Sequence, residues 1–404
     1  MPYLLHEIEI TQPLPTLTLS EAQTGIGLIV RRRDRAIGFL MQSLAPNSVI
    51  LPDTIAEWIA AEVGEKILQE SIGDELSLDT KPETLPTLTV VICTKDRPED
   101  LARCLQHLLA LQGDPAAFEL LVVDNAPSDQ RTETLVASLP TVHYVQEPKP
   151  GLDFARNRAL QTVQTEMLAF IDDDVAVDRG WLAGLRSAIA QYPEAAAFTG
   201  LVLPYELATD AQVLFEQAGG FRRGFDRIYY GQSEPDNPFY PCGSGIFGAG
   251  CNMAFRRDAL LQLGGFDDAL DTGAPLPGGG DLDIFYRVVR AGYPLVYEPR
   301  YLVFHRHRRE YEKLRRQYWS WGLGFMAFVV KSCQTDPALR PRFYSLIRWW
   351  FKDQFRQLRK SFSHDRRVLP PAMVVAQLWG GIEGLMGGYG RSRNRIQQIR
   401  RQFS

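Results

Sequence analysis

Cysteine is scarce in this 404-residue sequence, and the number and spacing of its cysteines argue against two common structural features. The five cysteines form no C-x-x-C pair and are odd in number, which argues against a zinc site built on cysteine and against a disulfide framework. The opening residues, MPYLLHEIEITQPLP, lack a basic stretch followed by an apolar one. We therefore expect no secretory signal and a cytoplasmic location.

Long apolar runs and a dinucleotide-binding glycine motif are also missing. The apolar segment at 319–330 is too short to span a bilayer, and the one at 370–390 contains Glu383 and many glycines. The strand expected at 88–94 runs into CTKDRP with no G-x-G-x-x-G, so the pyrophosphate cradle of a dinucleotide-dependent oxidoreductase is absent. That class of enzyme is disfavoured.

Charge is distributed unevenly along the chain. Residues 300–404 carry 18 Arg and 4 Lys against 6 acidic residues, a local balance of about +16, whereas the whole chain has a net charge of -4. A basic tail of this kind suits an anionic membrane surface; helices that pack on the rest of the chain and expose arginine to solvent are an equal alternative. Nucleic acid is disfavoured as a partner, because the acidic body would repel a second polyanion.

The pattern of the sequence changes twice, which predicts three parts. Residues 1–85 are expected to form a small α+β module with no role that we can assign, made of two strands around a basic turn at 27–42 and a helix at 51–72. A polar linker follows at 77–87. Residues 86–307 are expected to form the catalytic domain, and 308–404 a basic, aromatic-rich helical extension.

Short apolar strands alternate with amphipathic helices in the middle part of the chain. Because strands that are apolar on both faces belong to sheets with helices on either side, this alternation predicts an α/β fold with a mostly parallel sheet. The strands are expected at 88–94, 118–124, 141–147 and 167–174.

Polar clusters follow each of these four strands, where ligands bind in parallel sheets. The clusters are Thr94 to Arg97, Asp124 with Asn125, Glu147 to Gly151, and Asp172 to Asp174. The last lies in FIDDDVAV, where three adjacent carboxylates repel one another unless a positive charge lies among them. Strand alternation would place Asp172 and Asp174 on one side, ready to share a hard divalent cation with a diphosphate. A solvated loop or a helix cap is the alternative interpretation.

The stretch from Thr87 to His307 resembles the family 2 glycosyltransferases, which are inverting, nucleotide-sugar-dependent enzymes of the GT-A fold. The resemblance is carried, in order, by TVVICTKDRPEDLARCLQHLLAL, LLVVDNAPSDQ, EPKPGLDFARNRAL, AFIDDDVAV and GGGDLDIFYRVVRAGY. It implies a Rossmann-like, mostly parallel sheet of the GT-A type.

The resemblance also implies roles for individual residues. The nucleotide-sugar donor would be held by Thr94, Asp96, Arg97, Asp124, Arg156, Asp172 and Asp173. The cation, Mn²⁺ or Mg²⁺, would be bound by Asp174 and Asp172 with His305 as a third ligand. Asp281 would be the catalytic base.

One position departs from the pattern of the family. Its members commonly have Glu-Asp where this chain has Gly280-Asp281, so one carboxylate is missing and Asp283 is a candidate to replace it. On a helix the two aspartates are about 200° apart, so only one can face the sugar. We prefer Asp281, because the glycines before it let the chain approach the substrate closely.

The function that follows is an inverting transfer of a sugar from a nucleoside-diphosphate sugar to a hydroxyl of a saccharide or lipid-linked acceptor, in polysaccharide or cell-surface glycan synthesis. A catalytically inactive nucleotide-sugar or glycan-binding protein of the same fold is the alternative, because a carboxylate is missing at Gly280. The segment RPRFYSLIRWWFKDQFRQLRKSF interleaves cations with aromatics. It suits a peripheral position on the inner face of the cell membrane.

Overall fold

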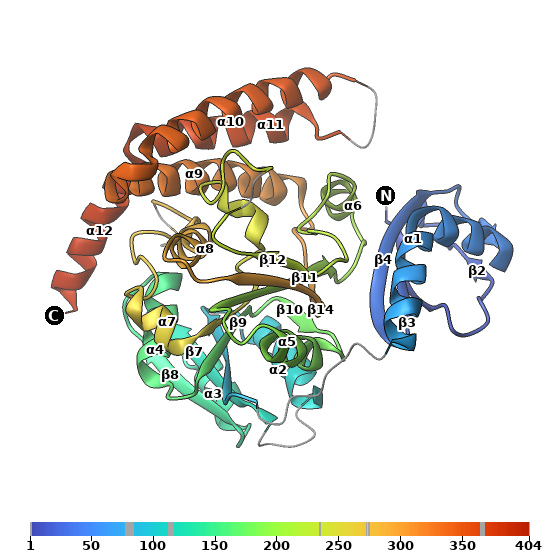
Figure 1. Cartoon of the computed structure of the whole chain (residues 1–404), viewed down its shortest axis with the longest axis horizontal. Helices are drawn as coiled ribbons and strands as arrows, with labels where there is room; N and C mark the ends of the chain where they lie inside the picture. The colour runs from blue at the N-terminus through green and yellow to red at the C-terminus, as the bar shows by residue number, and fades with distance from the viewer. Residues whose placement is uncertain are drawn as a thin grey trace.

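The computed structural model describes residues 2–76, 85–111, 117–233, 236–271, 273, 275–363 and 368–403. Figure 1 shows three regions: strands and a helix near the N-terminus, a central sheet with helices around it, and a C-terminal layer of long helices. Most of the linker expected at 77–87 lies outside the described residues.

The N-terminal region is a small sheet covered by one helix. Its sheet has the order β1-β3-β4, with β1 parallel to β3 and β4 antiparallel to it. Helix α1 buries Ile55, Ile59 and Val63. The expected strand pair and helix are therefore present, whereas β1 and a short β2·β5 pair were not expected. The bounds are β1 (Leu4–Glu9), β2 (Leu17–Thr18), β3 (Gly25–Arg32), β4 (Arg35–Ser43), β5 (Val49–Ile50) and α1 (Pro52–Glu75).

The central sheet has nine strands in the described residues, in the order β10-β14-β11-β13-β9-β6-β7-β8, and β12 pairs with β14. All but β10, β12 and β13 run in one direction. This confirms the α/β class with a mostly parallel sheet. The bounds are β6 (Leu88–Thr94), β7 (Glu119–Asn125), β8 (Val142–Glu147), β9 (Met167–Asp172), β10 (Val175–Val177), β11 (Ala197–Pro204), β12 (Ile228–Tyr230), β13 (Asn252–Arg256) and β14 (Leu295–His305).

Helices cover both faces of this sheet, because its strands are apolar on both sides. One core cluster joins the sheet to α2, α3 and α5, and a second joins it to α4, α7 and α8. Helix α6 packs near the N-terminal region, where Leu207 and Val213 meet Tyr3. The bounds are α2 (Pro98–Leu111), α3 (Arg131–Ala137), α4 (Leu152–Thr162), α5 (Trp181–Gln191), α6 (Asp210–Gln217), α7 (Arg257–Gln262) and α8 (Gly280–Arg290).

The C-terminal helices form a layer over α8 (Figure 1). Helix α11 packs closely on α9 because Gly380 has no side chain: a Cβ there would lie 2.0 Å from the carbonyl oxygen of Trp319. No helix in the described part of the chain has the length and apolar character that crossing a membrane requires. The bounds are α9 (Tyr311–Thr335), α10 (Arg340–Lys360), α11 (Pro371–Glu383) and α12 (Tyr389–Gln402).

The N-terminal region is docked on the sheet next to β10. Its buried Arg31 pairs with Asp178, which directly follows β10, at 2.5 Å between Nη2 and Oδ2. The amide of Tyr3 donates to the carbonyl oxygen of Leu207 at 2.8 Å. These contacts place the region beside the edge of the sheet where β9 ends.

Candidate functional site

Neighbouring parallel strands end together at one edge of the central sheet. In the register of the sheet Thr94 lies opposite Asp124, and Cys93 lies opposite Asp172. The polar residues that follow β6, β7 and β9 are therefore adjacent in space, as the sequence predicts. This edge of the sheet is where the candidate site lies.

The acidic triplet lies at a turn between two strands. We expected a strand through Asp174, but β9 ends at Asp172 and the chain turns at Asp173 and Asp174 into β10. Strand β10 pairs with the end of β14, with Val175 opposite His305. The turn rather than strand alternation therefore sets the direction of the aspartates, and it brings His305 beside them.

Asp172, Asp174 and His305 form the one group of three or more potential metal ligands among the described residues. Each offers one ligand atom, and these atoms all lie within 4.8 Å of one another. The Nε2 atom of His305 is 3.4 Å from Oδ1 of Asp174, and that buried oxygen accepts no hydrogen bond from the described residues. Two carboxylate oxygens and one imidazole nitrogen suit a divalent cation such as Mn²⁺.

The protonation of these groups reflects their burial. Burial, together with the neighbouring Asp174, raises the pKa of Asp172 to about 6. Burial also lowers the pKa of His305 to about 4, although Asp174 opposes this, so the imidazole is neutral at pH 7. A neutral imidazole is the form that binds a metal. The cluster thus has the charge and the lone pairs that a cation needs.

Arg97 is the positive side chain that lies among the carboxylates. Its Nη2 atom is 2.6 Å from Oδ1 of Asp173, and its Nη1 is 3.2 Å from Oδ2 of Asp174. Arg308 lies farther away, at 3.7 Å from the same oxygen of Asp174. Burial would raise the pKa of Asp174, but the charges of Arg97 and Arg308 help to lower it below its usual value.

Asp173 points away from the metal-ligand cluster. Its Oδ2 accepts a hydrogen bond from the hydroxyl of Thr94 at 2.7 Å. Burial raises the pKa of Asp173 to about 7, although Arg97 opposes this. Thr94 and Asp173 thus tie the end of β6 to the turn after β9, which fixes the shape of the site.

The two aspartates expected near the nucleoside, Asp96 and Asp124, differ in the hydrogen bonds that their carboxylate oxygens accept. Asp96 accepts from the backbone amide and the hydroxyl of Ser128 at 2.8 and 2.9 Å, through Oδ1. Asp124 is fully buried, and its Oδ2 accepts from the hydroxyl of Tyr144 at 3.0 Å. Its other oxygen has no hydrogen-bond partner in the described residues, and burial raises its pKa. Asp124 therefore has an acceptor left for an N–H of a ligand.

Arg156 is buried in a second acidic cluster. Its Nη1 donates to Oδ1 of Asp153 at 2.9 Å and to Oδ2 of Asp271 at 3.2 Å. Burial raises the pKa of Asp271 to about 6, although Arg156 opposes this. Sequence reasoning missed Asp271, and the Gly278–Gly280 run that follows was the signal for a close approach of the backbone here. The Oδ2 atom of Asp271 accepts from the amide of Gly280 at 3.1 Å.

Asp281 is brought to the same edge of the sheet. Its Oδ2 accepts from the amide of Gly250 at 3.1 Å, and a Cβ at Gly250 would lie 2.9 Å from that of Asp281. Gly250 precedes β13, whose Asn252 lies opposite Ile171 at the end of β9. The half-buried Asp281 therefore lies close to the acidic triplet.

Asp283, the alternative to Asp281, lies on another side of α8 from it. It is fully buried on the side of α8 that faces α9. One of its oxygens pairs with Lys331 of α9, and the other accepts from Nε of Arg287 at 2.7 Å. With both oxygens held by cations inside the protein, Asp283 cannot take a proton from a substrate.

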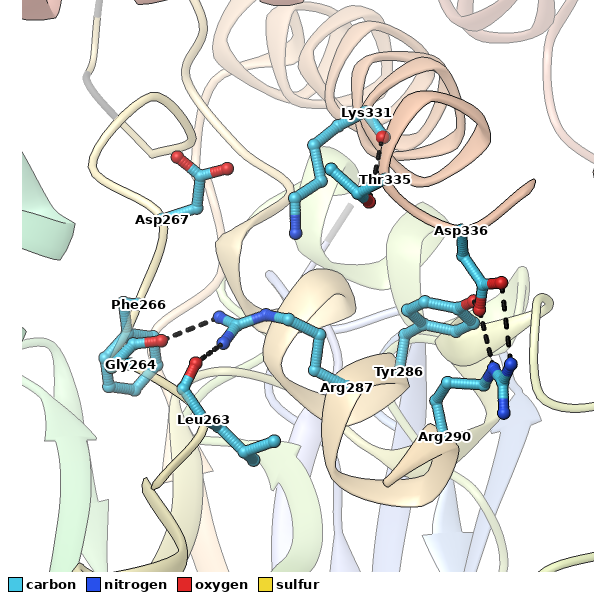
Figure 2. A pocket seen from close by; sticks show the side chains of 11 residues that line it. Leu263, Gly264, Phe266, Asp267, Tyr286, Arg287, Arg290, Lys331, Thr335 and Asp336 are labelled. Atoms are coloured by element: carbon cyan, nitrogen blue, oxygen red, sulfur yellow. Dashed lines mark hydrogen bonds and ion pairs between the residues drawn. The ribbon is translucent and has the colours of Figure 1, made fainter. Parts of the chain in front are cut away.

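Figure 2 shows the cavity on that side of α8, which is separate from the acidic triplet. The cavity has a volume of about 630 Å³, and the guanidinium of Arg287 points across it to the carbonyl oxygens of Leu263 and Gly265. Arg290 and Tyr286 both donate to Asp336 on its other side. The polar side chains of this cavity thus hold α8 against α9.

An α/β sheet with acidic residues and a histidine at its strand ends is the arrangement expected of a nucleotide-sugar transferase. Residues 89–264 match the family described as glycosyl transferase family 2. This part of the chain is therefore similar to the family 2 glycosyltransferases. The matched segment contains the acidic triplet, whereas Asp281 and His305 lie beyond it.

Individual relatives are similar over part of their length. The pre-mycofactocin glycosyltransferase of Mycobacterium tuberculosis is 24% identical over 63% of this chain and 50% of its own. The succinoglycan biosynthesis protein ExoM of Rhizobium meliloti is 30% identical over 52% of this chain and 64% of its own. The chain thus spans about half to two thirds of the length of these curated relatives.

Among solved structures, the mannosyltransferase PcManGT from Pyrobaculum calidifontis in complex with GDP-Man and Mn²⁺ superposes with a TM-score of 0.48 and 14% sequence identity. The superposition covers 81% of this chain and 96% of that chain.

Proposed function

We propose that the protein is a glycosyltransferase that uses a divalent cation, Mn²⁺ or Mg²⁺, and transfers a sugar from a nucleoside-diphosphate sugar, with inversion, to a hydroxyl group. The observation that carries this proposal is the convergence of Asp172, Asp174 and His305 at the ends of β9 and β14. The acceptor is a saccharide or a lipid-linked saccharide, as in polysaccharide or cell-surface glycan synthesis. In this account residues 86–307 are the catalytic part of the chain and 308–404 an extension.

The donor is held by polar groups at the ends of the strands. The unpaired oxygen of Asp124 accepts from the nucleobase, while Thr94, Asp96 and Asp173 hold the surrounding loops in place. Arg97, which pairs with Asp173 and Asp174 in the structure, would supply a positive charge for the diphosphate. Arg156 stays among the buried aspartates, where its charge opposes the rise in the pKa of Asp172 that burial causes.

Asp172, Asp174 and His305 would hold the cation, and a bound cation neutralises the negative charge that develops on a departing nucleoside diphosphate. Asp281 is the base that removes the proton of the acceptor hydroxyl as it attacks. This role is supported by its hydrogen-bond partners, which are the backbone amides of Gly250 and Leu282. Attack from the side opposite the diphosphate inverts the anomeric carbon.

The glycine at position 280 favours an enzyme over an inactive binding protein. A Cβ at Gly280 would lie 2.3 Å from Asp153 Oδ2 and 2.5 Å from Asp271 Oδ2, so no glutamate side chain fits there. The Asp271 carboxylate instead lies beside this backbone and bonds to its amide. The carboxylate that the family pattern places at 280 is thus compensated by one from the preceding loop.

A position on the inner face of the cell membrane is the second part of the proposal. Helix α10 exposes Phe355 together with Arg348, Lys352 and Arg356, and α11 exposes Val375, Trp379 and Ile382. Exposed aromatics among cations suit the interface of an anionic bilayer, with the rings at headgroup depth. Such a position would bring the catalytic domain close to a lipid-linked acceptor.

Release of nucleoside diphosphate from a panel of nucleotide sugars, measured with and without Mn²⁺, tests the proposal. We expect release that requires both Mn²⁺ and an acceptor or water, and that falls to background in EDTA. Binding of a nucleotide sugar without any release, across the whole panel, would instead establish the inactive binding protein.

A further inference from the structure

One side of helix α11 carries exposed apolar side chains at a helical spacing. Val375, Trp379 and Ile382 are 51%, 57% and 37% exposed, and their spacing of four and three residues places them on one face of the helix. Another face of α11 is buried, where Leu378 packs against Met326 of α9. Contiguous apolar patches on a surface mark binding sites. The exposed face of α11 therefore calls for a partner that the described residues do not supply.

This face forms one wall of a groove between α11 and the first half of α9. The groove has a volume of about 630 Å³, within the range of about 300–1,000 Å³ that is typical of small-molecule sites. Trp319 of α9 lines it, and the Nε1 atom of Trp319 already donates to Oε2 of Glu383 at 3.2 Å. A groove with such a lining suits a hydrocarbon chain. The apolar lining residues are Trp319, Ala372, Val375, Ala376 and Trp379.

The α9 side of the groove is basic. Three cations line it, Lys313, Arg315 and Arg316, with one acidic residue, Glu312. Arg315 pairs with Glu312 at 2.8 Å, and Lys313 pairs with Glu310 at 2.6 Å. Arg316 is exposed and has no hydrogen bond or ion pair with any other residue that the structure describes. Because a guanidinium binds phosphate through two parallel hydrogen bonds, Arg316 suits a phosphate at the side of an apolar groove.

The groove lies close along the chain to the candidate cation site. The Nη1 atom of Arg308 is 3.7 Å from Oδ2 of Asp174, and α9 begins three residues later at Tyr311. At no more than ~3.6 Å per extended residue and ~1.5 Å per helical residue, the Cα atoms of Arg308 and Lys313 are at most about 14 Å apart. A phosphate bound beside the groove would thus lie near the place to which an acceptor must be brought.

We propose that this groove binds a lipid phosphate, with the hydrocarbon chain along Trp319 and Trp379 and the phosphate at Arg316. The inference deepens the proposed function and rests on it for the role of the lipid, which is to carry the acceptor saccharide. It is distinct from the contact of α10 and α11 with a membrane surface, because the groove holds a single lipid chain and requires no bilayer.

A lipid phosphate in solution tests the groove without a membrane. Farnesyl phosphate, kept below the concentration at which it forms micelles, is titrated into the full chain in buffer free of divalent cations, and binding is measured by calorimetry. Farnesol and inorganic phosphate are titrated in parallel. We expect farnesyl phosphate to bind about tenfold more tightly than farnesol, because hydrogen bonds to charged groups are added, and inorganic phosphate not to bind measurably. Equal binding of farnesol and farnesyl phosphate would overturn the role of Arg316.

Two substitutions in the groove have matched controls on α10. Trp379→Ser should weaken the binding of farnesyl phosphate about tenfold, because a large apolar contact is lost. Arg316→Gln should weaken it by a similar factor. Phe355→Ser and Arg348→Gln remove an exposed aromatic and an exposed arginine that do not line the groove, and they should leave the affinity unchanged. Equal losses in Trp379→Ser and Phe355→Ser would show that the lipid adheres to exposed aromatics in general, which would overturn the inference.

The outcomes separate the groove from the proposed function. No binding of farnesyl phosphate by the unmodified chain would overturn the inference, whereas Mn²⁺-dependent release of nucleoside diphosphate would leave the proposed function standing. Binding of farnesyl phosphate without any such release would support the groove and refute the proposed function. Sedimentation that shows a dimer, separated into monomers by Trp379→Ser, would show that a second copy of the chain covers α11, and this too would overturn the inference.

Discussion

Asp281 and Asp283 are two residues apart on α8, yet their surroundings give them different tasks. Asp281 accepts hydrogen bonds from backbone amides at the edge of the sheet, whereas Asp283 neutralises Lys331 and Arg287 inside the protein. A helix of 3.6 residues per turn separates such a pair by more than half a turn. In the proposed mechanism Asp281 is thus the carboxylate that does the chemistry, whereas Asp283 stabilises the fold.

These surroundings predict that an Asp→Asn substitution has different effects at the two positions. Asp281→Asn should keep the affinity for the nucleotide sugar and lower its turnover about 10²- to 10⁴-fold, because the base is lost. Asp283→Asn should leave Lys331 buried without its counter-ion and lower the free energy of unfolding by about 3 kcal/mol. Product release, donor titration and urea denaturation of both variants provide the comparison. Normal turnover in Asp281→Asn would show that another group is the base.

The place of a single residue in the fold could be predicted only where the residue lies near the end of a strand or helix that the sequence pattern predicts. The acidic triplet, Asp124 and Asp281 each lie at or next to the end of a strand or helix, so the sequence placed them at one edge. Asp271 was missed because its ion-pair partner, Arg156, comes from a distant segment, and no local spacing reports such a contact. Arg97, which was expected at the nucleoside, pairs with Asp173 and Asp174 in the structure.

At the scale of elements, the four parallel strands and the helices between them were predictable, but the short antiparallel strands β10 and β12 were not. Strand β10 has three residues, too few for a hydrophobic period, and it pairs with a strand more than a hundred residues later in the chain. Without β10 the sequence predicted a straight strand through Asp174. The pairing of β10 with β14 is what creates the turn and brings in His305.

The outer helices allow a prediction about lipid binding. We expect the protein to co-sediment with vesicles that contain phosphatidylserine at low salt, and less so at high salt or with pure phosphatidylcholine, because each basic side chain near an anionic surface contributes about 1 kcal/mol. The double substitution Phe355→Ser and Trp379→Ser should weaken this binding. The control changes two exposed leucines elsewhere, Leu68 and Leu261, to serine. No binding at low salt would exclude the membrane surface as a partner.

At the scale of the whole molecule, the three regions meet around one edge of the central sheet. The N-terminal region contacts the sheet beside β10 through Arg31 and Asp178, and α9 holds the far side of α8 through Lys331. Composition and periodicity predicted three parts of the chain, but they did not predict where these parts contact one another. Docking depends on single buried ion pairs between segments, and those leave no periodic trace in a sequence.

The central claim is that Asp172, Asp174 and His305 hold a cation that in turn holds an activated sugar. Calorimetric titration of the protein with nucleoside diphosphates, with and without Mn²⁺, tests it most directly. We expect tight binding that requires Mn²⁺ in the unmodified protein and loses this requirement, together with most of its affinity, in Asp174→Ala. The exposed Asp226→Ala serves as the matched control. Nucleotide binding that is equal with and without Mn²⁺, or equally Mn²⁺-dependent in Asp174→Ala, would contradict the account.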